Sequence, residues 1–274
     1  TPVAKAFLIH GFACNTRFYD EMVEHLTAAG ISCLRVDLPD FGFSTREYKG
    51  IHYIPQTEIL AQMMKDFDED GSGWILFGHS MGSFMARTIL CKYPDSGISA
   101  AIICGTGWQP TFALPALAKV IDAMGRKAGE EAPNEQLDKM IFGGYTKGIE
   151  NVRTPKDWLT RDSKIVDAYI ADPLCGFVAS SGLLRDMMLG IHYIQQPKHI
   201  HNMKKHLPVF FIAGGDDPVG GYGAGVIQAA EEFKKHGMAQ VGVKIYPLCR
   251  HEIHNELAIR DEVEAGLIAF VNGV

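Results

Sequence analysis

The chain has 274 residues, of which 47% are hydrophobic and 21% are charged, and its net charge is −6. This composition predicts a globular protein with a substantial core, and the mild charge gives no reason to expect nucleic acid or an anionic membrane as a partner. No apolar run approaches the roughly 18 residues that a membrane-spanning helix needs, so we expect no integral membrane segment.

Short apolar runs rich in branched and aromatic side chains alternate with amphipathic stretches along the chain. The apolar runs have the length and composition of buried parallel strands. We expect strands over 4–10, 31–39, 74–79, 99–105, 207–215 and 240–248, and helices over 17–29, 55–68, 81–92, 224–236 and 256–271. Strand alternating with helix is typical of a doubly wound α/β fold, so we predict a mostly parallel sheet.

The alternation breaks once, between 106 and 206, where helix-like segments occur without a convincing strand. Apolar side chains recur there at helical spacing, over 112–124, 158–170 and 183–194. We therefore predict an α/β core over 1–105 and 207–274, with an inserted helical cap (lid) over 106–206. An insertion after the fourth strand lies over the carboxyl ends of the strands, so we expect part of its apolar surface to contact a substrate. The rest would pack on the sheet.

The stretch GHSMG places Ser80 directly after the run 74–79, between Gly78 and Gly82. One interpretation is a nucleophile elbow, a tight strand-to-helix turn that holds a serine hydroxyl at its tip. The other is an ordinary glycine-rich turn. Ligands of open α/β sheets bind at the carboxyl ends of the strands, where Ser80 lies. We therefore predict that Ser80 is a nucleophile.

A serine hydroxyl needs a base to take its proton, and the base needs a carboxylate to orient it. In one large group of serine hydrolases the chain order is serine, acid, histidine, with the acid and the base on loops after late strands. The loop after 207–215 contains Asp216 and Asp217, and the loop after 240–248 contains His251 and His254. The order fits, but the spacing alone leaves two candidates for each role.

The oxyanion of an acyl-transfer reaction also needs two backbone N–H groups close to the developing charge. One would be the N–H of Met81, directly after the nucleophile. The second would come from the loop after the first strand, where Gly11 allows a close approach and Phe12 carries the N–H. We expect His10 to brace this loop rather than to transfer protons.

The remaining histidines and the cysteines indicate neither a metal site nor a disulfide framework. His199, His201 and His206 lack a nearby carboxylate or cysteine pattern, so we expect a solvated connection there. HEIH is not the HExxH motif of zinc proteases, and phosphate-binding glycine motifs are absent. We expect no metal and no organic cofactor. The six cysteines form no CxxC pair, which predicts free thiols and a cytoplasmic location.

Five segments together resemble the monoacylglycerol lipase and lysophospholipase-like branch of the α/β-hydrolase superfamily, which is related to the serine aminopeptidases. They are HGFACNTRFYDEMVEHLTAAGISCLRVDLPDFGFS, GHSMG, ADPLCGF, GGDDPVGGYGAGV and YPLCRHEIHNE. The resemblance implies an α/β-hydrolase fold. Its G-x-x-D pattern, counted from Gly214, selects Asp217 as the acid, and it selects His251 as the base. It places His254 at the start of a helix, and it assigns the oxyanion hole to Phe12 and Met81.

The chain departs from this branch in two places. Relatives usually have an antiparallel pair of strands before the segment that matches 4–10, so either the sheet is shortened or an N-terminal piece is missing. Ser83 replaces the second glycine of the common GHSMGG sequence, and a residue this small should be tolerated.

The resemblance and the residues together predict a serine hydrolase that cleaves carboxylic esters with an apolar acyl group, such as monoacylglycerols or lysophospholipids, through an acyl-enzyme. The partner would be a small lipid-like ester, and the sequence leaves the oligomeric state open. An aminopeptidase-like or thioesterase activity on the same residues is the alternative. A ligand-binding protein without activity is a further alternative from another class.

Overall fold

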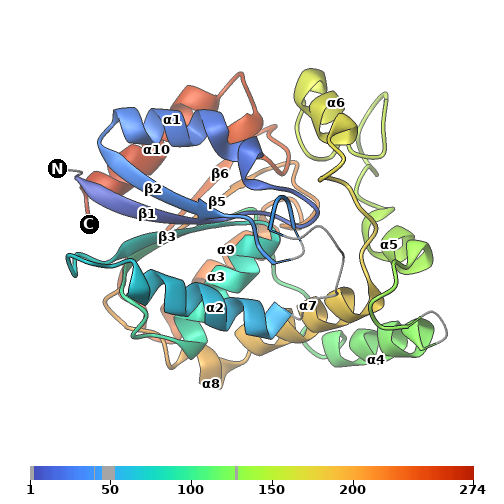
Figure 1. Ribbon diagram of the computed structural model, residues 1–274, viewed down its shortest axis with the longest axis horizontal. Coiled ribbons are helices and arrows are strands. Elements are labelled where there is room, and N and C mark those ends of the chain that lie inside the picture. Colours follow the sequence, from blue (N-terminus) through green and yellow to red (C-terminus); the bar gives the residue numbers. More distant parts are fainter. Residues whose placement is uncertain (1–2, 40, 45–52, 127–128) are drawn as a thin grey trace.

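The computed structural model describes residues 3–39, 41–44, 53–126 and 129–274, and its centre is a sheet of six parallel strands (Figure 1). The strands lie in the order β2-β1-β3-β4-β5-β6. Their bounds are β1 (Ala4–Ile9), β2 (Ile31–Val36), β3 (Trp74–His79), β4 (Ile98–Cys104), β5 (Val209–Gly214) and β6 (Val241–Tyr246). Each strand lies within a predicted run or within one residue of it, which confirms the predicted parallel α/β sheet.

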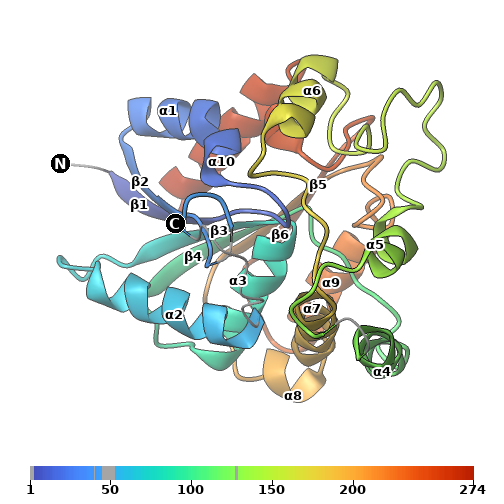
Figure 2. The same cartoon turned by 45° about the vertical axis from the view of Figure 1, so that its right-hand side comes forward.

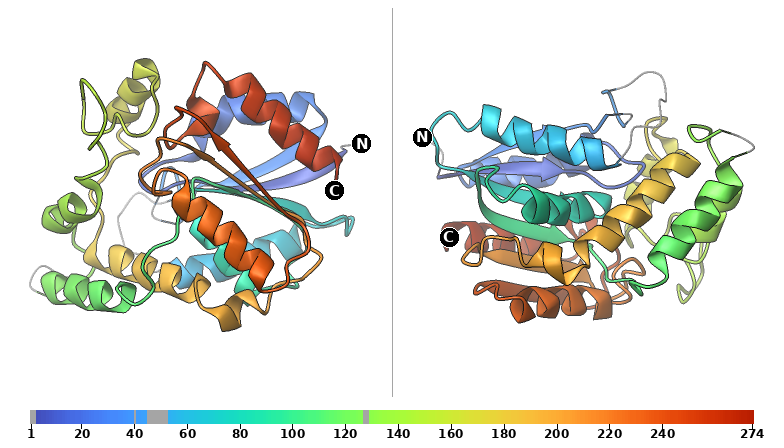
Figure 3. Two further views of the ribbon diagram at one scale, coloured as in Figure 1. Left: turned by 180° about the vertical axis from the view of Figure 1, so that it is seen from behind. Right: turned by 90° about the horizontal axis from the view of Figure 1, so that it is seen from below.

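Helices cover both faces of the sheet (Figures 1 and 3). The helices α1 (Asp20–Ala28) and α10 (Arg260–Asn272) lie on one face, and α2 (Tyr53–Asp66), α3 (Met81–Lys92) and α9 (Ala224–Lys235) lie on the other. Every residue of β3 is buried, as are nearly all residues of α3. A helix buried on all sides belongs to the core, so the turn between β3 and α3 has a rigid support.

The chain leaves β1 for β2 on one side and returns to β3 on the other side of β1. The carboxyl ends of β1 and β3 are therefore neighbours at a point where the strand order reverses. Open α/β sheets bind their ligands at such points. The loop after β1 and the turn after β3 meet there, and these are the segments that contain Phe12 and Ser80.

Between β4 and β5 the described residues form helices, and we call residues 106–206 the helical insertion. The helices are α4 (Leu114–Gly125), α5 (Glu135–Phe142), α6 (Ser163–Ala171), α7 (Ser181–Ile194) and the single turn α8 (Pro197–Ile200). Helices α4, α5 and α6 lie beyond the carboxyl ends of the strands, and α7 packs against α2 and α3 (Figure 2). Residues 127–128 of the predicted cap, and 1–2, 40 and 45–52 of the predicted core, lie outside the described residues.

Two predicted helices begin later than expected. The stretch 158–170 is helical only from Ser163, because Asp162 caps the helix by accepting hydrogen bonds from the N–H groups of Lys164 and Ile165. The last helix begins at Arg260, and His254 lies in a short 3₁₀ turn, η2 (Ile253–Asn255), rather than at a helix start. Residues 251–256 are all buried, which an amphipathic surface helix cannot achieve with six successive residues.

Candidate active site

Ser80 occupies a sharp turn between β3 and α3 that glycine makes possible on both sides. Its backbone has φ 56° and ψ −123°, in a region that side chains rarely adopt. A Cβ on Gly78 would lie 2.3 Å from the carbonyl oxygen of Gly82, and a Cβ on Gly82 would lie 2.2 Å from the carbonyl oxygen of Ile9. Neither position accepts a larger residue, which explains the GHSMG pattern. This geometry is that of a nucleophile elbow.

His251 and Asp217 come together from the loops after β6 and β5. The Nδ1 atom of His251 lies 2.9 Å from Oδ2 of Asp217, and both side chains are buried. The other carboxylate oxygen of Asp217 accepts a hydrogen bond from the N–H of Val219 at 2.9 Å. Of the two candidate acids, the structure brings Asp217 to the imidazole and leaves Asp216 exposed.

The second ring nitrogen of His251 is available for chemistry. Because the N–H at Nδ1 donates a hydrogen bond to the Asp217 carboxylate, Nε2 is the ring nitrogen that carries the lone pair. Within the described residues Nε2 is buried without a hydrogen-bond partner. His251 and Ser80 line the same cavity of about 400 Å³. Catalytic hydrogen bonds are often long before substrate binds and tighten in the complex, so the open Nε2 is compatible with a base that takes a serine proton.

The loop after β1 runs directly beside Ser80. A Cβ on Gly11 would lie 3.2 Å from Cβ of Ser80, so the backbone that leads to the N–H of Phe12 passes close to the Ser80 side chain. The N–H of Met81, the first residue of α3, has no acceptor within its helix. Phe12 and Met81 both line the cavity, where two N–H groups could stabilise an oxyanion.

His10 braces the same loop with both ring nitrogens. Its Nδ1 lies 2.7 Å from the carbonyl oxygen of Gly11, and its Nε2 accepts a hydrogen bond from the N–H of Leu38 at 3.0 Å. Burial lowers the pKa of His10, so the ring is neutral with its proton on Nδ1. The Gly11–Phe12 peptide is thereby held in one orientation, in agreement with the role predicted for His10.

Tyr19 and His79, to which the sequence analysis assigned no role, connect the Phe12 loop with the His251 loop. The N–H of Gly11 donates to the Tyr19 hydroxyl (3.1 Å), which lies 2.7 Å from Nδ1 of His79. Nε2 of His79 donates to the carbonyl oxygen of His251 at 3.2 Å. Burial, with His251 and His254 nearby, lowers the pKa of His79 well below its ordinary value. The only sequence feature that could have drawn attention to His79 is its position directly before Ser80.

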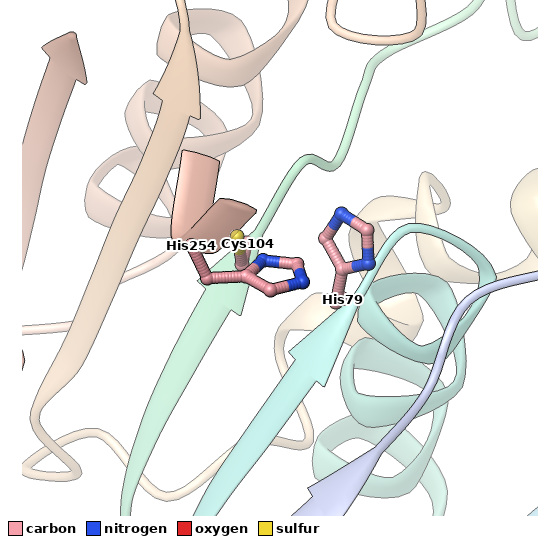
Figure 4. A group of neighbouring side chains, drawn as sticks. All are labelled: His79, Cys104 and His254. Atoms are coloured by element: carbon pink, nitrogen blue, oxygen red, sulfur yellow. The ribbon is translucent and has the colours of Figure 1, made fainter. Parts of the chain in front are cut away.

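A buried group of possible metal ligands comprises His79, Cys104 and His254 (Figure 4), and the His79 ring lies 4.7 Å from that of His251, centroid to centroid. Their ligand atoms lie within 4.8 Å of one another. Both nitrogens of His79 already make hydrogen bonds, and burial raises the pKa of the Cys104 thiol well above its ordinary value. Metal binding requires a thiolate and free nitrogens, so this group is not preorganised for an ion.

His254 belongs to the buried core. Its ring stacks on Tyr19 with 4.7 Å between centroids, and burial lowers its pKa to about 3. Of the three histidines before β5 that the sequence predicted to lie in a solvated connection, His201 and His206 are exposed, and His199 stacks on Tyr193 with 3.6 Å between centroids.

The cavity has an apolar side and a more polar side. Side chains from α3, α4 and α7 form the apolar side, namely Phe84, Leu114, Leu117, Met187, Met188 and Ile191. Toward α6 the lining includes Tyr169 and Glu252. Burial raises the pKa of Glu252, whose Oε2 accepts a hydrogen bond from Asn255 at 2.8 Å.

Comparison with known proteins identifies the family of the chain. The profile of the serine aminopeptidase (S33) family matches residues 1–258. The chain belongs to this family. Its fold is that of the α/β hydrolases, and the chain is a carboxylic ester hydrolase of the esterase and lipase type.

Individual relatives support this assignment. The monoacylglycerol lipase of Mycolicibacterium smegmatis is 24% identical over 267 residues, which cover 93% of this chain and 83% of the relative. The crystal structure of a highly thermostable carboxyl esterase from Bacillus coagulans is 28% identical, with a TM-score of 0.88, and covers 100% of this chain and 90% of that one. The monoacylglycerol lipase of Paleococcus ferrophilus shares the fold, with a TM-score of 0.73 and 21% identity over 98% of this chain and 94% of that one.

Two further findings concern the cysteines and the helices. All six cysteines are free thiols. In the part of the chain that the structure describes, no helix combines the length and the apolar character that crossing a bilayer requires.

Proposed function

We propose that Ser80, His251 and Asp217 form the catalytic triad of a serine esterase that acts on esters with an apolar acyl chain. The observation that carries this proposal is the pairing of Asp217 with His251, which leaves Nε2 without a hydrogen-bond partner among the described residues, while His251 and Ser80 line the same cavity. A base oriented by a buried carboxylate beside a serine on an elbow is the arrangement that acyl transfer needs.

The reaction proceeds in two halves. His251 Nε2 takes the hydroxyl proton as Ser80 Oγ attacks the ester carbonyl, and the N–H groups of Phe12 and Met81 stabilise the oxyanion. The tetrahedral adduct collapses, the ester C–O bond breaks, and the leaving alcohol receives the proton from His251. Water then attacks the acyl-enzyme with His251 again as base. Ser80 regains its proton and the carboxylic acid is released.

The apolar side of the cavity supports an acyl chain as the part of the substrate that binds there. Each methylene transferred from water to such a surface contributes about 0.8 kcal/mol, or roughly a fourfold gain in affinity. The names of two relatives, both monoacylglycerol lipases, suggest a monoacylglycerol as substrate. In this proposal the helical insertion forms the cap that selects the acyl chain, and no cofactor takes part.

An aminopeptidase-like reaction is the second candidate, because the family is named for serine aminopeptidases. Recognition of a substrate ammonium group needs an ionised carboxylate in the pocket. The cavity lining contains two carboxyl groups, Asp138 and Glu252, and burial raises the pKa of both and so disfavours their charged forms. This observation favours the esterase. We also propose a cytoplasmic location, which the six free thiols support.

The test is kcat/KM for a series of p-nitrophenyl esters and monoacylglycerols with two to about sixteen acyl carbons, below the micelle concentration, together with aminoacyl p-nitroanilides. We expect kcat/KM to rise with acyl length until the cavity is filled and then to fall. Ser80→Ala should remain folded and lose both turnover and labelling by a fluorophosphonate. Faster turnover of the anilides than of every ester would favour the peptidase, and labelling of Ser80→Ala would place the nucleophile elsewhere.

A further inference from the structure

The loop that carries Phe12 contains a strained residue whose carbonyl group is held from the helical insertion. Ala13 follows Phe12 and has φ 47°, which is uncommon for a residue other than glycine. Its carbonyl oxygen accepts a hydrogen bond from the Tyr169 hydroxyl at 2.7 Å and another from the N–H of Gly176 at 2.8 Å. Both donors belong to the insertion, and Ala13 and Tyr169 are buried.

Side-chain contacts strengthen the same connection. The amide nitrogen of Asn15, a buried residue, lies 3.0 Å from Oδ2 of Asp172 and 3.3 Å from Sγ of Cys175. Arg17 forms an ion pair with the same oxygen of Asp172 at 3.0 Å. The turn that follows α6 is therefore attached to the loop at several successive residues.

The segment before α6 is attached in the same manner to the loop that carries His251. The N–H of Glu252 donates to the carbonyl oxygen of Leu159 at 2.7 Å, and the guanidinium of Arg250 donates to the carbonyl oxygen of Thr160 at 3.1 Å. Thr160 returns a hydrogen bond from its hydroxyl to the carbonyl oxygen of Asn255 at 3.0 Å. The ring of Trp158 lies 5.0 Å from that of His251, centroid to centroid.

One continuous segment, residues 157–176, thus contacts both loops of the candidate site, with α6 between its two attachment points (Figure 2). A strained backbone conformation persists only where surrounding contacts over-determine it. Loss of the Tyr169 hydroxyl would leave the Ala13 carbonyl with the N–H of Gly176 as its one donor, so Ala13 would be less constrained and the N–H of Phe12 would shift with it. Oxyanion stabilisation depends strongly on the position of its donors, so even a small displacement lowers the rate.

We propose that residues 157–176 act as a clamp segment that completes the oxyanion hole, and that Tyr169 is a positioning residue for the N–H of Phe12. The clamp rests on the proposed serine esterase mechanism. It assigns the helical insertion a second task besides acyl selection, because one part of it fixes catalytic geometry while α4 and α7 form the acyl side of the cavity.

The test compares Tyr169→Phe with the wild-type enzyme on p-nitrophenyl butyrate and on a long-chain ester. This variant removes only the hydroxyl, and its ring can keep the packing of Tyr169 against Phe18, now 5.6 Å between centroids. We expect kcat to fall about tenfold with KM unchanged, which is less than the 10²–10³-fold loss on deleting a whole oxyanion donor. The inhibition constant of an alkyl trifluoromethyl ketone, which forms a tetrahedral adduct with the serine, should rise by the same factor. Affinity for the product fatty acid should not change.

The matched control is Tyr93→Phe, which removes a buried hydroxyl that has no hydrogen-bond partner among the described residues. It should leave kcat and both affinities unchanged. Asp172→Asn provides a second variant if Tyr169→Phe fails to fold, and it should lower kcat in the same direction by a smaller factor.

Three results would overturn the clamp: a wild-type kcat in folded Tyr169→Phe, a change in KM alone, or a loss that grows with acyl length, as expected for an altered cavity wall. A failure of the proposed function would give a different result, since the wild-type enzyme itself would turn over none of the esters. Inhibition by the trifluoromethyl ketone requires only that the serine hydroxyl adds to the ketone carbonyl. It therefore reports on the clamp whatever the natural substrate.

Discussion

The Asp217 carboxylate lies 2.9 Å from Nδ1 of His251, although 34 positions separate the two residues in the chain. A Cβ on Gly214, at the end of β5, would lie 2.1 Å from the carbonyl oxygen of Cys249 and 2.2 Å from that of Arg250. The backbone before His251 therefore passes in contact with the end of β5. This close approach places the His251 ring beside the Asp217 carboxylate.

Asp217→Asn should lower kcat by about 10⁴, by analogy with the serine proteases, because an amide favours the wrong tautomer of the imidazole. Asp216→Asn is the matched control, since its side chain is exposed and it stands one position away. We expect the control to change kcat by less than about twofold. Steady-state kinetics on one short ester suffice, and a larger loss at Asp216 would contradict the assignment.

His254→Phe should make the fold less sensitive to acid. His254 has a pKa of about 3 in the folded state and about 6.5 when unfolded, so the unfolded chain binds the proton more tightly. Its contribution to stability is present above pH 6.5 and is lost as the pH falls toward 3, by at most about 1.4 kcal/mol per pH unit. Phenylalanine keeps a ring against Tyr19 and cannot be protonated. As the pH is lowered from 7 to 4, the melting temperature of the variant should fall less steeply than that of the wild type. Parallel curves of melting temperature against pH for the two proteins would contradict this prediction.

Glu252→Gln should have the opposite pH dependence. Burial raises the pKa of Glu252, so the folded state binds the proton more tightly than the unfolded chain does. The contribution of the carboxyl group is present below its unfolded pKa, near 4.5, and is lost as the pH rises through the folded value. The melting temperature of the variant, relative to wild type, should therefore increase from pH 4.5 to pH 8. Glu58→Gln, at an exposed position, should show no such trend.

Leu117→Trp should move the optimum of acyl length toward shorter chains. Leu117 lines the apolar side of the cavity from α4 and is only partly buried, so a larger ring can extend into the space for the substrate. Turnover of an acetate ester should persist because its acyl group does not reach that side. Val120→Trp, on an exposed position of the same helix, is the control. An unchanged length profile for Leu117→Trp would argue against α4 as part of the acyl site.

The turn at Ser80 could be anticipated from the sequence because its requirements are local. Gly78 and Gly82 stand two positions before and after Ser80, where a Cβ atom would clash with neighbouring backbone. Choosing between Asp216 and Asp217, or between His251 and His254, is another kind of problem. Neighbouring residues on a loop have the same spacing to every motif, and the direction of each side chain depends on contacts with other loops. The resemblance to known hydrolases selected Asp217 and His251, whereas the spacing alone did not.

The sequence by itself determined the parallel sheet, since strands buried on both faces must be apolar throughout and therefore stand out as runs along the chain. Only the tertiary structure decided which contacts the helical insertion makes with the loops of the site. The stretch 158–170 has a helical pattern, but its first residues bond to the His251 loop instead. The Tyr169 hydroxyl reaches Ala13 across 156 positions. Such contacts follow from the packing of distant segments, and the period of hydrophobic residues within one segment carries no information about them.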